Sequence, residues 1–320
     1  MMSTRTGIQL LPATDADYPV VQTLSSYYIY DFTEYLGWPC PASGRFGGCD
    51  EMFAEWQAGK NYPFLISVGG ELAGFAAVAL DTGTREFYIQ EFFIVRKFRR
   101  QGVGKAVAYR LFEPFAGPWR VEWLLANSPA RQFWQPALQR YLGVEALRMD
   151  EHASPWGHMQ TLSFTREVAQ DFAFADISSL HDGEMELHLE RTIPSYPTRS
   201  WLPTYDFALR VDGAPAGDIN LRIGNTSNIL LYGGHIGYNV EPAFRGQHFA
   251  ERACRLLFPL AQAHGLTTVW ITTTPDNVAS RRTCERLDAR LVEIVPVPED
   301  NDLFAIGDRE KCRYRIDLPA

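Results

Sequence analysis

The sequence predicts an α/β fold, an α+β arrangement of helices and mixed sheets, that occurs twice along one chain. Strand-like and helix-like patterns alternate over its 320 residues, a length typical of two domains. The order strand, glycine-containing loop, helix, strand and asparagine appears in both halves. Arg99 is matched by Arg245, 146 residues later, and Asn127 by Asn277, 150 residues later. Two matches in the same order at near-equal offsets indicate an internal duplication.

The composition is typical of a globular protein and predicts no nucleic-acid and no membrane partner. Hydrophobic residues make up 46% of the chain, charged residues make up 21%, and the formal net charge is −8. A dedicated binder of nucleic acid or of an anionic membrane would instead carry a broad basic face. The first fifteen residues lack the apolar core of a secretory signal, so we expect a cytoplasmic protein.

The cysteines predict neither a disulfide framework nor a metal site. Their number is odd and their spacing matches no zinc-binding pattern. We therefore expect free thiols in a reducing compartment and no bound metal. The five are Cys40, Cys49, Cys254, Cys284 and Cys312.

The first half, residues 1–167, is expected to form one domain. Tyr18, Val21 and Leu24 recur at helical spacing, so a helix should begin near residue 14 or 15. Residues 37–50 are rich in Gly and Pro and should form a loop. Apolar runs and turn residues predict strands at 7–12, 64–68, 73–80, 87–95, 121–126 and 158–166. Helices are expected at 103–112 and at 130–141, the latter broken near Pro136.

Residues 168–183 are the weakest stretch for a core, so we expect a linker there and a second domain at 184–320. Apolar residues on one face of 248–264 predict a helix, which Pro259 should kink. Another helix is expected at 279–287. The expected strands lie at 185–189, 206–211, 217–223, within 229–240, at 268–273 and at 313–318.

The main functional signal is the segment EFFIVRKFRRQGVG, residues 91–104. An apolar strand runs into a loop that contains Gly102 and Gly104, and a helix follows. The free N–H groups of such a helix start, together with the helix dipole, favour a pyrophosphate. Glycine permits close approach to a phosphate, and Arg99 and Arg100 add positive charge. The Rossmann and P-loop patterns fit worse, because neither G-x-G-x-x-G nor G-K-[ST] is present.

The pattern V-x-x-F-R-x-x-G-x-G, between a strand and an amphipathic helix, resembles the GNAT superfamily of acyl-CoA-dependent N-acetyltransferases. The resemblance covers nearly the whole chain and implies two tandem GNAT-like acetyltransferase domains that bind acetyl-CoA. In that family the strand before the loop splays from its neighbour, and the pantetheine of coenzyme A lies in the gap. The cofactor contacts implied in the first domain are Phe93, Ile94, Val95, Arg99, Arg100, Gln101, Gly102, Val103, Gly104, Lys105 and Asn127.

The second domain resembles the same family with one change in its loop. The segment IGYNVEPAFRGQHFA, residues 236–250, is similar to the family's Gly-Tyr strand and R-G-x-G-x-A loop. His248 stands where glycine is usual, and its side chain could crowd the phosphates or donate to them. The segment PDNVAS, residues 275–280, is similar to the family's P-x-N-x-x-S. The implied cofactor contacts are Val240, Arg245, Gly246, Gln247, His248, Phe249, Ala250, Asn277 and Ser280.

The reaction of this family needs a base that takes a proton from the acceptor amine. The resemblance implies Glu91, at the start of the splayed strand, as that catalytic base; an ion-paired structural glutamate is the alternative. His235 and Glu241 lie near the corresponding strand, and we expect a hydrogen-bonded His and a solvated Glu. The family's common general acid is a tyrosine, which Trp134 and Cys284 replace here, and this argues against a tyrosine-assisted mechanism.

The acceptor is expected to be an amine of a small molecule or of a peptide. Aromatic and acidic residues at 27–35 would suit a cationic amine, although they are also typical of a helix that packs on a core. With its intact loop, the first domain should hold the cofactor, while catalysis in the second domain is the other enzymatic reading. The contrasting reading is a non-catalytic acyl-CoA-binding or interaction protein with degenerate GNAT domains. A monomer that acts as a pseudo-dimer and a homodimer both fit the sequence.

Overall fold

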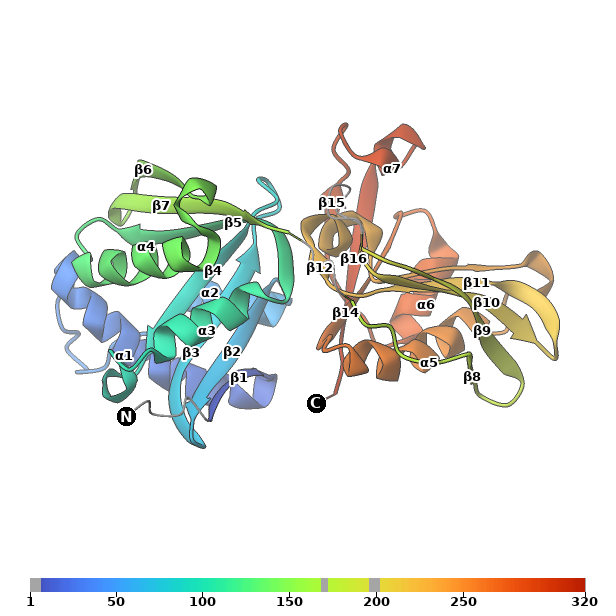
Figure 1. Ribbon diagram of the computed structural model, residues 1–320, viewed down its shortest axis with the longest axis horizontal. Coiled ribbons are helices and arrows are strands. Elements are labelled where there is room, and N and C mark those ends of the chain that lie inside the picture. The colour runs from blue at the N-terminus through green and yellow to red at the C-terminus, as the bar shows by residue number, and fades with distance from the viewer. Residues whose placement is uncertain (1–6, 168–171, 196–201, 320) are drawn as a thin grey trace. The chain divides into compact units, whose positions relative to one another are not determined.

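A computed structural model describes residues 7–167, 172–195 and 202–319. The chain forms two compact units, Met1–Arg166 and Glu167–Ala320, here called unit 1 and unit 2. Each contains helices and sheets (Figure 1), so the predicted α/β fold is confirmed. Of the expected linker, residues 168–171 lie outside the described residues, whereas Phe172 and Phe174 pack on the core of unit 2.

The sheet of unit 1 has the strand order β1-β2-β3-β4-β5-β7-β6. Neighbouring strands along this order are antiparallel, except that β4 and β5 run parallel. The strands are β1 (Ile8–Pro12), β2 (Asn61–Val68), β3 (Glu71–Leu80), β4 (Phe87–Ile94), β5 (Phe115–Leu124), β6 (Arg148–Ser154) and β7 (Gly157–Arg166).

Four α-helices accompany this sheet: α1 (Tyr18–Leu36), α2 (Asp50–Ala58), α3 (Val103–Phe112) and α4 (Ser128–Leu142). Buried side chains of α1 and α2, including Val21 and Phe53, form one core with Phe75 of β3 and Phe93 of β4. Pro136 lies inside α4 without ending it, which corrects the expected break.

Unit 2 contains two sheets, with strand orders β13-β11-β10-β9-β8 and β14-β16-β15. The stretch 229–240 divides into a helical turn, Ile229–Gly233, and the strand β13. The strands of this unit are β8 (Ser179–His181), β9 (Met185–Ile193), β10 (Thr204–Val211), β11 (Ala214–Arg222), β12 (Asn225–Thr226), β13 (Ile236–Val240), β14 (Thr268–Thr273), β15 (Arg290–Pro296) and β16 (Glu310–Asp317).

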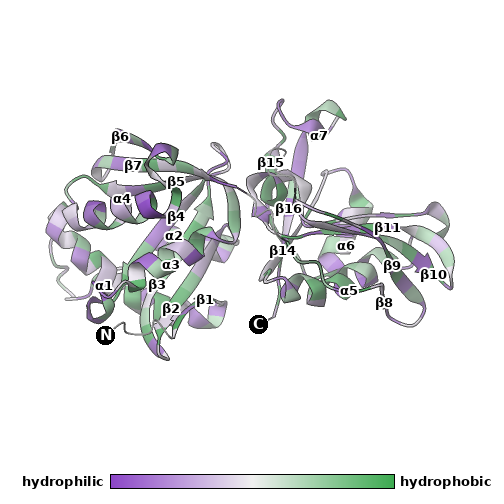
Figure 2. Cartoon of the chain, viewed as in Figure 1, coloured by the Kyte–Doolittle hydropathy of each residue, from purple (hydrophilic) through white to green (hydrophobic). Residues whose placement is uncertain are grey.

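The helices of unit 2 are α5 (Phe249–Ala263), α6 (Val278–Arg286) and α7 (Asp302–Ala305). One face of α5 is buried, through residues such as Phe249, Cys254 and Leu257, and Pro259 is accommodated in its last turns. Figure 2 shows hydrophobic and hydrophilic residues interleaved along this helix, as expected where one face covers a sheet. No described helix is both long and apolar enough to cross a membrane.

The two units differ in the connection that follows their first long strand. In unit 1, residues 13–60 join β1 to β2 and contain α1 and α2. In unit 2, only residues 194–203 join β9 to β10, the strands at the corresponding places in the sheet order. A connection this short cannot contain both helices, because each turn of helix needs 3.6 residues. The connection between β9 and β10 is therefore too short to contain counterparts of both α1 and α2.

Candidate active site

A gap opens between β4 and β5 because these parallel strands pair only at one end. Phe87 lies opposite Trp119 and Tyr88 opposite Arg120, whereas β4 continues to Ile94. Beyond these two pairs, the edge of β4 on this side keeps main-chain groups for another partner. This is the splayed arrangement that the family resemblance implies.

Ile94 presents main-chain groups to the gap, whereas its two neighbours turn theirs toward β3. The Val95 N–H donates to the Ala73 carbonyl at 2.9 Å, and the Phe93 carbonyl points at Gly74, where a Cβ atom would lie 2.0 Å from it. Successive residues of a strand direct their main-chain groups to opposite edges. Among the three predicted pantetheine contacts on β4, the geometry therefore favours Ile94.

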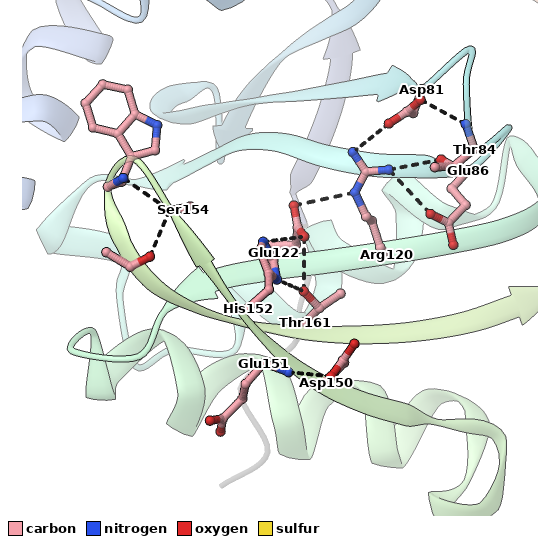
Figure 3. A network of polar contacts seen from close by, with 12 residues as sticks. Asp81, Thr84, Glu86, Arg120, Glu122, Asp150, Glu151, His152, Ser154 and Thr161 are labelled. Carbon is pink, nitrogen blue, oxygen red and sulfur yellow. Dashed lines mark hydrogen bonds and ion pairs between the residues drawn. The ribbon is translucent and has the colours of Figure 1, made fainter.

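Arg120 holds the closed end of the gap. Its guanidinium forms ion pairs with three carboxylates, those of Asp81 at 3.2 Å, Glu86 at 3.5 Å and Glu122 at 3.4 Å (Figure 3). It also lies 4.4 Å from the centre of the Tyr88 ring. These contacts join β5 to β4 and to the turn between β3 and β4. They fix the paired end of β4 and β5, beyond which the two strands separate.

In unit 2 the corresponding strands, β13 and β14, belong to different sheets, and His235 connects them. The His235 N–H donates to the Trp270 carbonyl at 2.7 Å, and its ring Nδ1 accepts from the Trp270 N–H at 2.9 Å. The ring Nε2 lies 3.1 Å from the Gly224 carbonyl and therefore carries the proton. Burial lowers the pKa of His235 to about 3, so the ring is neutral and its role is structural, as the sequence predicts.

A β-bulge at Gln90 sets the position of Glu91 on β4. Ala77 of β3 lies opposite Glu91, and the register shifts there so that Gln90 is an extra residue in β4. The Gln90 side chain accepts from Asn61 Nδ2 at 2.8 Å and donates to Glu55 Oε2 at 2.6 Å. The strand is thus fixed next to the predicted base.

Glu91 is partly buried, and its carboxyl group lies among side chains of α1 and α2. The hydroxyl of Tyr28 on α1 and the thiol of Cys49, the residue before α2, are the nearby donors that favour its charged form. Burial raises the pKa of Glu91 to about 7, although these two donors lower it, and the charge of Glu51 raises it further. No ion pair joins Glu91 to a cation within the described part of the chain, which argues against the structural alternative.

The loop between β4 and α3 places two residues in the left-handed conformation. Arg100 has a φ of 61°, and Gly102, the N-cap of α3, has a φ of 79°. The Ala106 N–H closes the first helical turn by donating to the Gly102 carbonyl at 3.1 Å. The N–H groups of residues 103–105 therefore have no acceptor within the helix and fit a diphosphate group.

Arg99 and Gly104, two of the predicted phosphate contacts, have clear roles within the protein. Arg99 Nε donates to the Ile94 carbonyl at 2.6 Å, and its Nη2 pairs with Asp31 of α1 at 2.6 Å. A Cβ atom on Gly104 would lie 3.1 Å from the Phe133 ring. Arg99 thus holds the end of β4, and Gly104 allows α3 to pack against α4.

Unit 2 keeps the same loop backbone with its glycine at the other left-handed position. Gly246, which corresponds to Arg100, has a φ of 80°, and His248, which corresponds to Gly102, has a φ of 65°. The Arg252 N–H donates to the His248 carbonyl and closes the first turn of α5. His248 therefore preserves the free N–H groups at this helix start, and its side chain is exposed.

Other predicted contacts in the two loops are divided between buried and exposed side chains. Val103 and Phe249 are buried in the first turns of α3 and α5 and anchor those helices. Gln101 Nε2 donates to the Lys97 carbonyl at 2.5 Å, and Gln247 is exposed. Lys105 and Ala250 lie in the first turns of α3 and α5, Val240 ends β13, and Arg245 Nε donates to the Val240 carbonyl at 2.8 Å.

A glycine that the sequence reading missed marks the same crossing point in each unit. A Cβ atom added to Gly74 would lie 2.0 Å from the carbonyl oxygen of Phe93. One added to Gly217 would lie 2.1 Å from the carbonyl oxygen of Asn239. Both residues have positive φ, 157° and 145°. An isolated glycine inside an apolar strand is the signal that could have revealed this close approach of two backbones.

Asn127 and Asn277 cap the helices that follow β5 and β14. The Oδ1 atom of Asn127 accepts from the Ala130 N–H at 3.0 Å, and that of Asn277 accepts from the Ser280 N–H at 3.1 Å. An N-cap of this kind satisfies a main-chain donor that the helix leaves free. Capping explains the repeated asparagine without a ligand, and cofactor contacts from Asn127, Asn277 and Ser280 stay predictions.

The two positions where the family commonly has tyrosine are part of the core. Trp134 is 5% exposed and lies 4.9 Å from the Phe92 ring, and Cys284 is fully buried. Burial raises the pKa of Cys284 to about 12. In unit 2 a tyrosine of β13 reaches α6, because the Tyr238 hydroxyl lies 2.9 Å from Ser280 Oγ, and burial raises the pKa of Tyr238. Neither Trp134 nor Cys284 is suited to protonate a leaving group.

The position of Glu91 is occupied by Gly237 in unit 2. Gly237 lies opposite Asn220 of β11, just as Glu91 lies opposite Ala77 of β3. A Cβ atom on Gly237 would lie 3.2 Å from Asn220 Oδ1 and 3.6 Å from Arg222 Nη1. Unit 2 thus has an amide and a cation where unit 1 has a carboxyl group.

The five cysteines are free thiols, and Cys40 alone among them is exposed. No group of three or more His, Cys, Asp or Glu side chains is placed to hold a metal ion in residues 7–167, 172–195 and 202–319.

Comparisons with known proteins identify the same family in both halves. A family model described as acetyltransferase (GNAT) family matches residues 28–137, and one described as acetyltransferase (GNAT) domain matches residues 150–290. A search of curated protein sequences returned no match to this chain.

Solved acetyltransferase structures resemble about half of the chain. The ribosomal-protein-S18-alanine N-acetyltransferase from Escherichia coli has 15% identity and a TM-score of 0.34, covering 52% of this chain and 99% of its own. An acetyltransferase from Thermus thermophilus has 16% identity and a TM-score of 0.38, with coverages of 50% and 98%. An aminoglycoside acetyltransferase in complex with coenzyme A has 15% identity and a TM-score of 0.37, with coverages of 50% and 95%. The two family models together match most of the chain, which therefore belongs to the GNAT acetyltransferase superfamily and carries two of its domains in tandem.

Proposed function

We propose that the chain is an N-acetyltransferase that transfers the acetyl group of acetyl-CoA to an amine of a small molecule or peptide, and that unit 1 performs the reaction. One observation carries this proposal. Glu91 places a carboxyl group with a pKa of about 7 on the splayed strand, whereas unit 2 has Gly237 at that position. A base whose pKa lies near the working pH is the most effective one for proton transfer.

The residues of unit 1 fit coenzyme A, which would supply the acetyl group as a thioester. The N–H groups of residues 103–105 would bind the diphosphate, with Arg100 and Lys105 as the nearby positive charges. The Ile94 carbonyl, which also accepts from Arg99, would accept an amide N–H of the pantetheine. Coenzyme A would be bound by main-chain groups of a strand edge and a helix start, which need no particular side chain. The two loops can therefore differ in their residues while they keep the same backbone.

The chemistry follows from the groups beside the gap. The Glu91 carboxylate would take the proton from the acceptor amine, directly or through a water molecule, and so make the nitrogen nucleophilic. A main-chain N–H at Ile94 would stabilise the negative charge that develops on the carbonyl oxygen. A thiol with a pKa of ~8.5 is a tolerable leaving group without a strong acid, which is compatible with Trp134 at the usual tyrosine position.

The test is a pH profile of thiol release with a panel of small and peptide amines. For the wild-type chain, kcat/KM should rise with pH through a midpoint near 7, because the base must be deprotonated. Glu91→Gln should lower kcat/KM by about 10²- to 10⁴-fold and remove this limb. Glu113→Gln, an exposed glutamate at the end of α3, is the matched control and should leave the profile unchanged. Wild-type turnover by Glu91→Gln would contradict the proposal.

A second candidate function applies to unit 2. Its loop keeps free N–H groups at the start of α5, but Gly237 replaces the carboxylate. These features favour a unit that binds acyl-CoA without turnover. Calorimetric binding of coenzyme A by unit 2, without thiol release from it, is the expected result. Thiol release that survives both Glu91→Gln and loss of cofactor binding by unit 1 would instead make unit 2 the enzyme.

A further inference from the structure

One face of the unit 2 sheet carries polar side chains at the place where unit 1 carries small apolar ones. Counted from the crossing-point glycine of each unit, Asn220 and Arg222 of β11 correspond to Ala77 and Ala79 of β3. Ala77 is buried in the core that α1 and α2 form with the sheet of unit 1. In unit 2, where the connection between β9 and β10 is too short to contain counterparts of both helices, an amide and a guanidinium group occupy these positions.

Arg222 is a partly buried cation that is held by carbonyl groups. Its Nη1 donates to the carbonyl of Gly233 at 3.3 Å and to that of Gly234 at 3.1 Å. Within the ranges that the structure describes, these are its only bonded acceptors, and no carboxylate forms an ion pair with it. Asp206, whose charge acts on Arg222 from β10, is itself paired with Arg191 at 2.7 Å. An arginine has five N–H donors, so several of them remain for an anion.

The side-chain amide of Asn220 lies near this cation and is also incompletely bonded. Its Oδ1 atom is buried and has no hydrogen-bond partner in the described chain. A Cβ atom added to Gly237, the opposite residue of β13, would lie 3.2 Å from Oδ1, 3.4 Å from Nδ2 and 3.6 Å from Arg222 Nη1. The amide and the guanidinium group therefore converge on one place beside Gly237. Rotation about the last side-chain bond exchanges the two ends of the amide, so Asn220 can present its NH₂ group there.

We propose that Arg222 and Asn220 form a carboxylate-binding site of unit 2. The two oxygens of a carboxylate accept hydrogen bonds, and a guanidinium group beside an amide NH₂ group supplies the donors. The carbonyl groups of Gly233 and Gly234 orient Arg222 without neutralising it, whereas a bound anion would also provide the opposite charge. An anionic partner offsets the cost of a partly buried cation. Burial lowers the pKa of Arg222, which is consistent with such a cost.

The place of this site in the fold suggests two sources of the carboxylate. Gly237 corresponds to Glu91, so the site lies where the thioester end of an acyl-CoA bound by unit 2 would lie. The carboxylate can belong to the acyl chain itself, as in succinyl-CoA, or to a separate small carboxylic acid. The first source rests on the proposed binding of acyl-CoA by unit 2, whereas the site does not. A cationic ligand is disfavoured because Arg222 would repel it.

Calorimetry with the full chain compares the two sources. Gly102→Trp is the background, because it should leave only the cofactor site of unit 2. Succinyl-CoA should bind to unit 2 about tenfold to a hundredfold more tightly than acetyl-CoA, which is the gain expected for hydrogen bonds between charged groups. Free succinate is titrated in the same background, and heat of binding without any thioester would identify a separate acid as the ligand.

Three variants assign the preference to the site. Arg222→Met should reduce the affinity for succinyl-CoA to that for acetyl-CoA and leave the affinity for acetyl-CoA unchanged. Arg210→Met, at an exposed arginine of β10, is the control and should keep the preference. Asn220→Asp has nearly the same shape as the wild type and should also abolish the preference, because its carboxylate would repel the ligand and pair with Arg222. It keeps the test decisive if Arg222→Met does not fold.

A second measurement uses the wild-type chain and reports on Arg222 alone. Phenylglyoxal modifies accessible arginines, and peptide mass spectrometry gives the rate of modification at each of them. Succinyl-CoA should slow the modification of Arg222 more than acetyl-CoA does, whereas Arg210 should react at the same rate with either thioester. Equal rates at Arg222 with both thioesters and with free succinate would contradict the site.

The outcomes separate this inference from the proposed function of unit 2. Equal affinities for succinyl-CoA and acetyl-CoA, with no binding of succinate, would overturn the carboxylate site and leave acyl-CoA binding intact. Binding of succinate that Arg222→Met removes, with no binding of either thioester, would support the site and refute acyl-CoA binding. A preference for succinyl-CoA that survives both Arg222→Met and Asn220→Asp would overturn the site.

Discussion

Single residues in the loop of unit 2 show what a left-handed backbone position tolerates. Gly246 has a φ of 80°, and no atom lies within 4 Å of the place where a Cβ atom would stand. A side chain there would meet no neighbour, so its cost would be backbone strain alone. His248 already adopts a φ of 65° in the same loop, and histidine is among the residues that enter this region more readily.

The first prediction isolates this strain. Gly246→Val should lower the free energy of unfolding of unit 2 by about 1–2 kcal/mol, because a β-branched residue is poorly suited to positive φ. Gly246→Asn should cost less, because asparagine adopts the left-handed conformation more easily. Urea titrations of both variants provide the measurement. Equal losses would show that the cost comes from something other than the backbone.

His235 yields a prediction about pH. The folded state keeps the ring neutral because burial lowers its pKa to about 3, whereas the unfolded value is near 6.5. Below pH 6.5 the unfolded chain takes up a proton that the folded chain refuses. The stability that this residue contributes is therefore present above pH 6.5 and is lost as the pH falls toward 3, by up to about 1.4 kcal/mol per unit.

His235→Gln checks this sign. The variant should be less stable than the wild type at pH 7.5, because the hydrogen bonds of His235 to Trp270 and Gly224 are disturbed. The difference in the free energy of unfolding should shrink between pH 6.5 and 5, where the wild type bears the proton-linked cost and the variant does not. Curves that stay parallel over this range would contradict the assignment of a neutral buried ring.

At the scale of elements, α1 reaches both ends of the segment that forms the site. The Tyr28 ring lies 5.8 Å from the Phe93 ring of β4, and Asp31, one turn later, pairs with Arg96 and Arg99 at 2.6 Å each. Arg99 in turn binds the carbonyl of Ile94 at the end of β4. One helix thus sets the position of the predicted base and of the start of the phosphate loop.

Arg120 supports the third prediction, which concerns the closed end of the gap. Arg120→Met should lower the free energy of unfolding of unit 1 by about 2–3 kcal/mol, because three carboxylates at 3.2–3.5 Å would lose their shared cation. Arg148→Met, at an exposed position of β6, should have an effect below about 0.5 kcal/mol. The measurement is the melting temperature of each variant. Equal melting temperatures for Arg120→Met and Arg148→Met would refute a special role for Arg120.

Elements with a clear apolar period could be predicted from the sequence, and those that depend on a neighbour could not. The strand β6 is polar and exposed along most of its length, and it forms because β7 pairs with it. The helix α2 was missed, although Met52, Phe53 and Trp56 lie on one face, because a loop rich in Gly and Pro precedes it. Tertiary pairing and packing decide such segments, and local propensity does not reveal them.

At the scale of the whole chain, the backbone of both cofactor loops could be anticipated, whereas the surroundings of Glu91 could not. The loops are local, and their glycines and helix starts are visible in a short stretch of sequence. Tyr28, Cys49 and Glu91 lie far apart along the chain and meet only through the packing of α1, α2 and β4. The 146-residue offset between the two loops aligns Glu91 with Gly237, and the register of β11 and β13 agrees with that alignment.

The fourth prediction assigns the reaction to one unit. Gly102→Trp and His248→Trp place the same bulky side chain at corresponding N-cap positions of α3 and α5. Gly102→Trp should abolish thiol release and remove one binding event for coenzyme A, because the side chain would obstruct the helix start. His248→Trp should leave turnover within about threefold of the wild type, an effect below about 1 kcal/mol in the barrier.

Circular dichroism of both variants is the control for folding. Loss of turnover in His248→Trp, with turnover retained in Gly102→Trp, would transfer the chemistry to unit 2. Loss in both would show that the two domains cannot work separately.

Glycine occupies different left-handed positions in the two loops, and this limits which further substitutions each loop can accept. Each copy needs two left-handed residues, and each uses only one glycine for them: Gly102 in one copy, Gly246 in the other. A copy without either would accumulate roughly 2–4 kcal/mol of strain, a large part of the 5–15 kcal/mol that keeps a typical domain folded. Either left-handed position of a loop can therefore lose its glycine, but both cannot do so without a large loss of stability. The loop backbone is conserved between the two units although its residues differ.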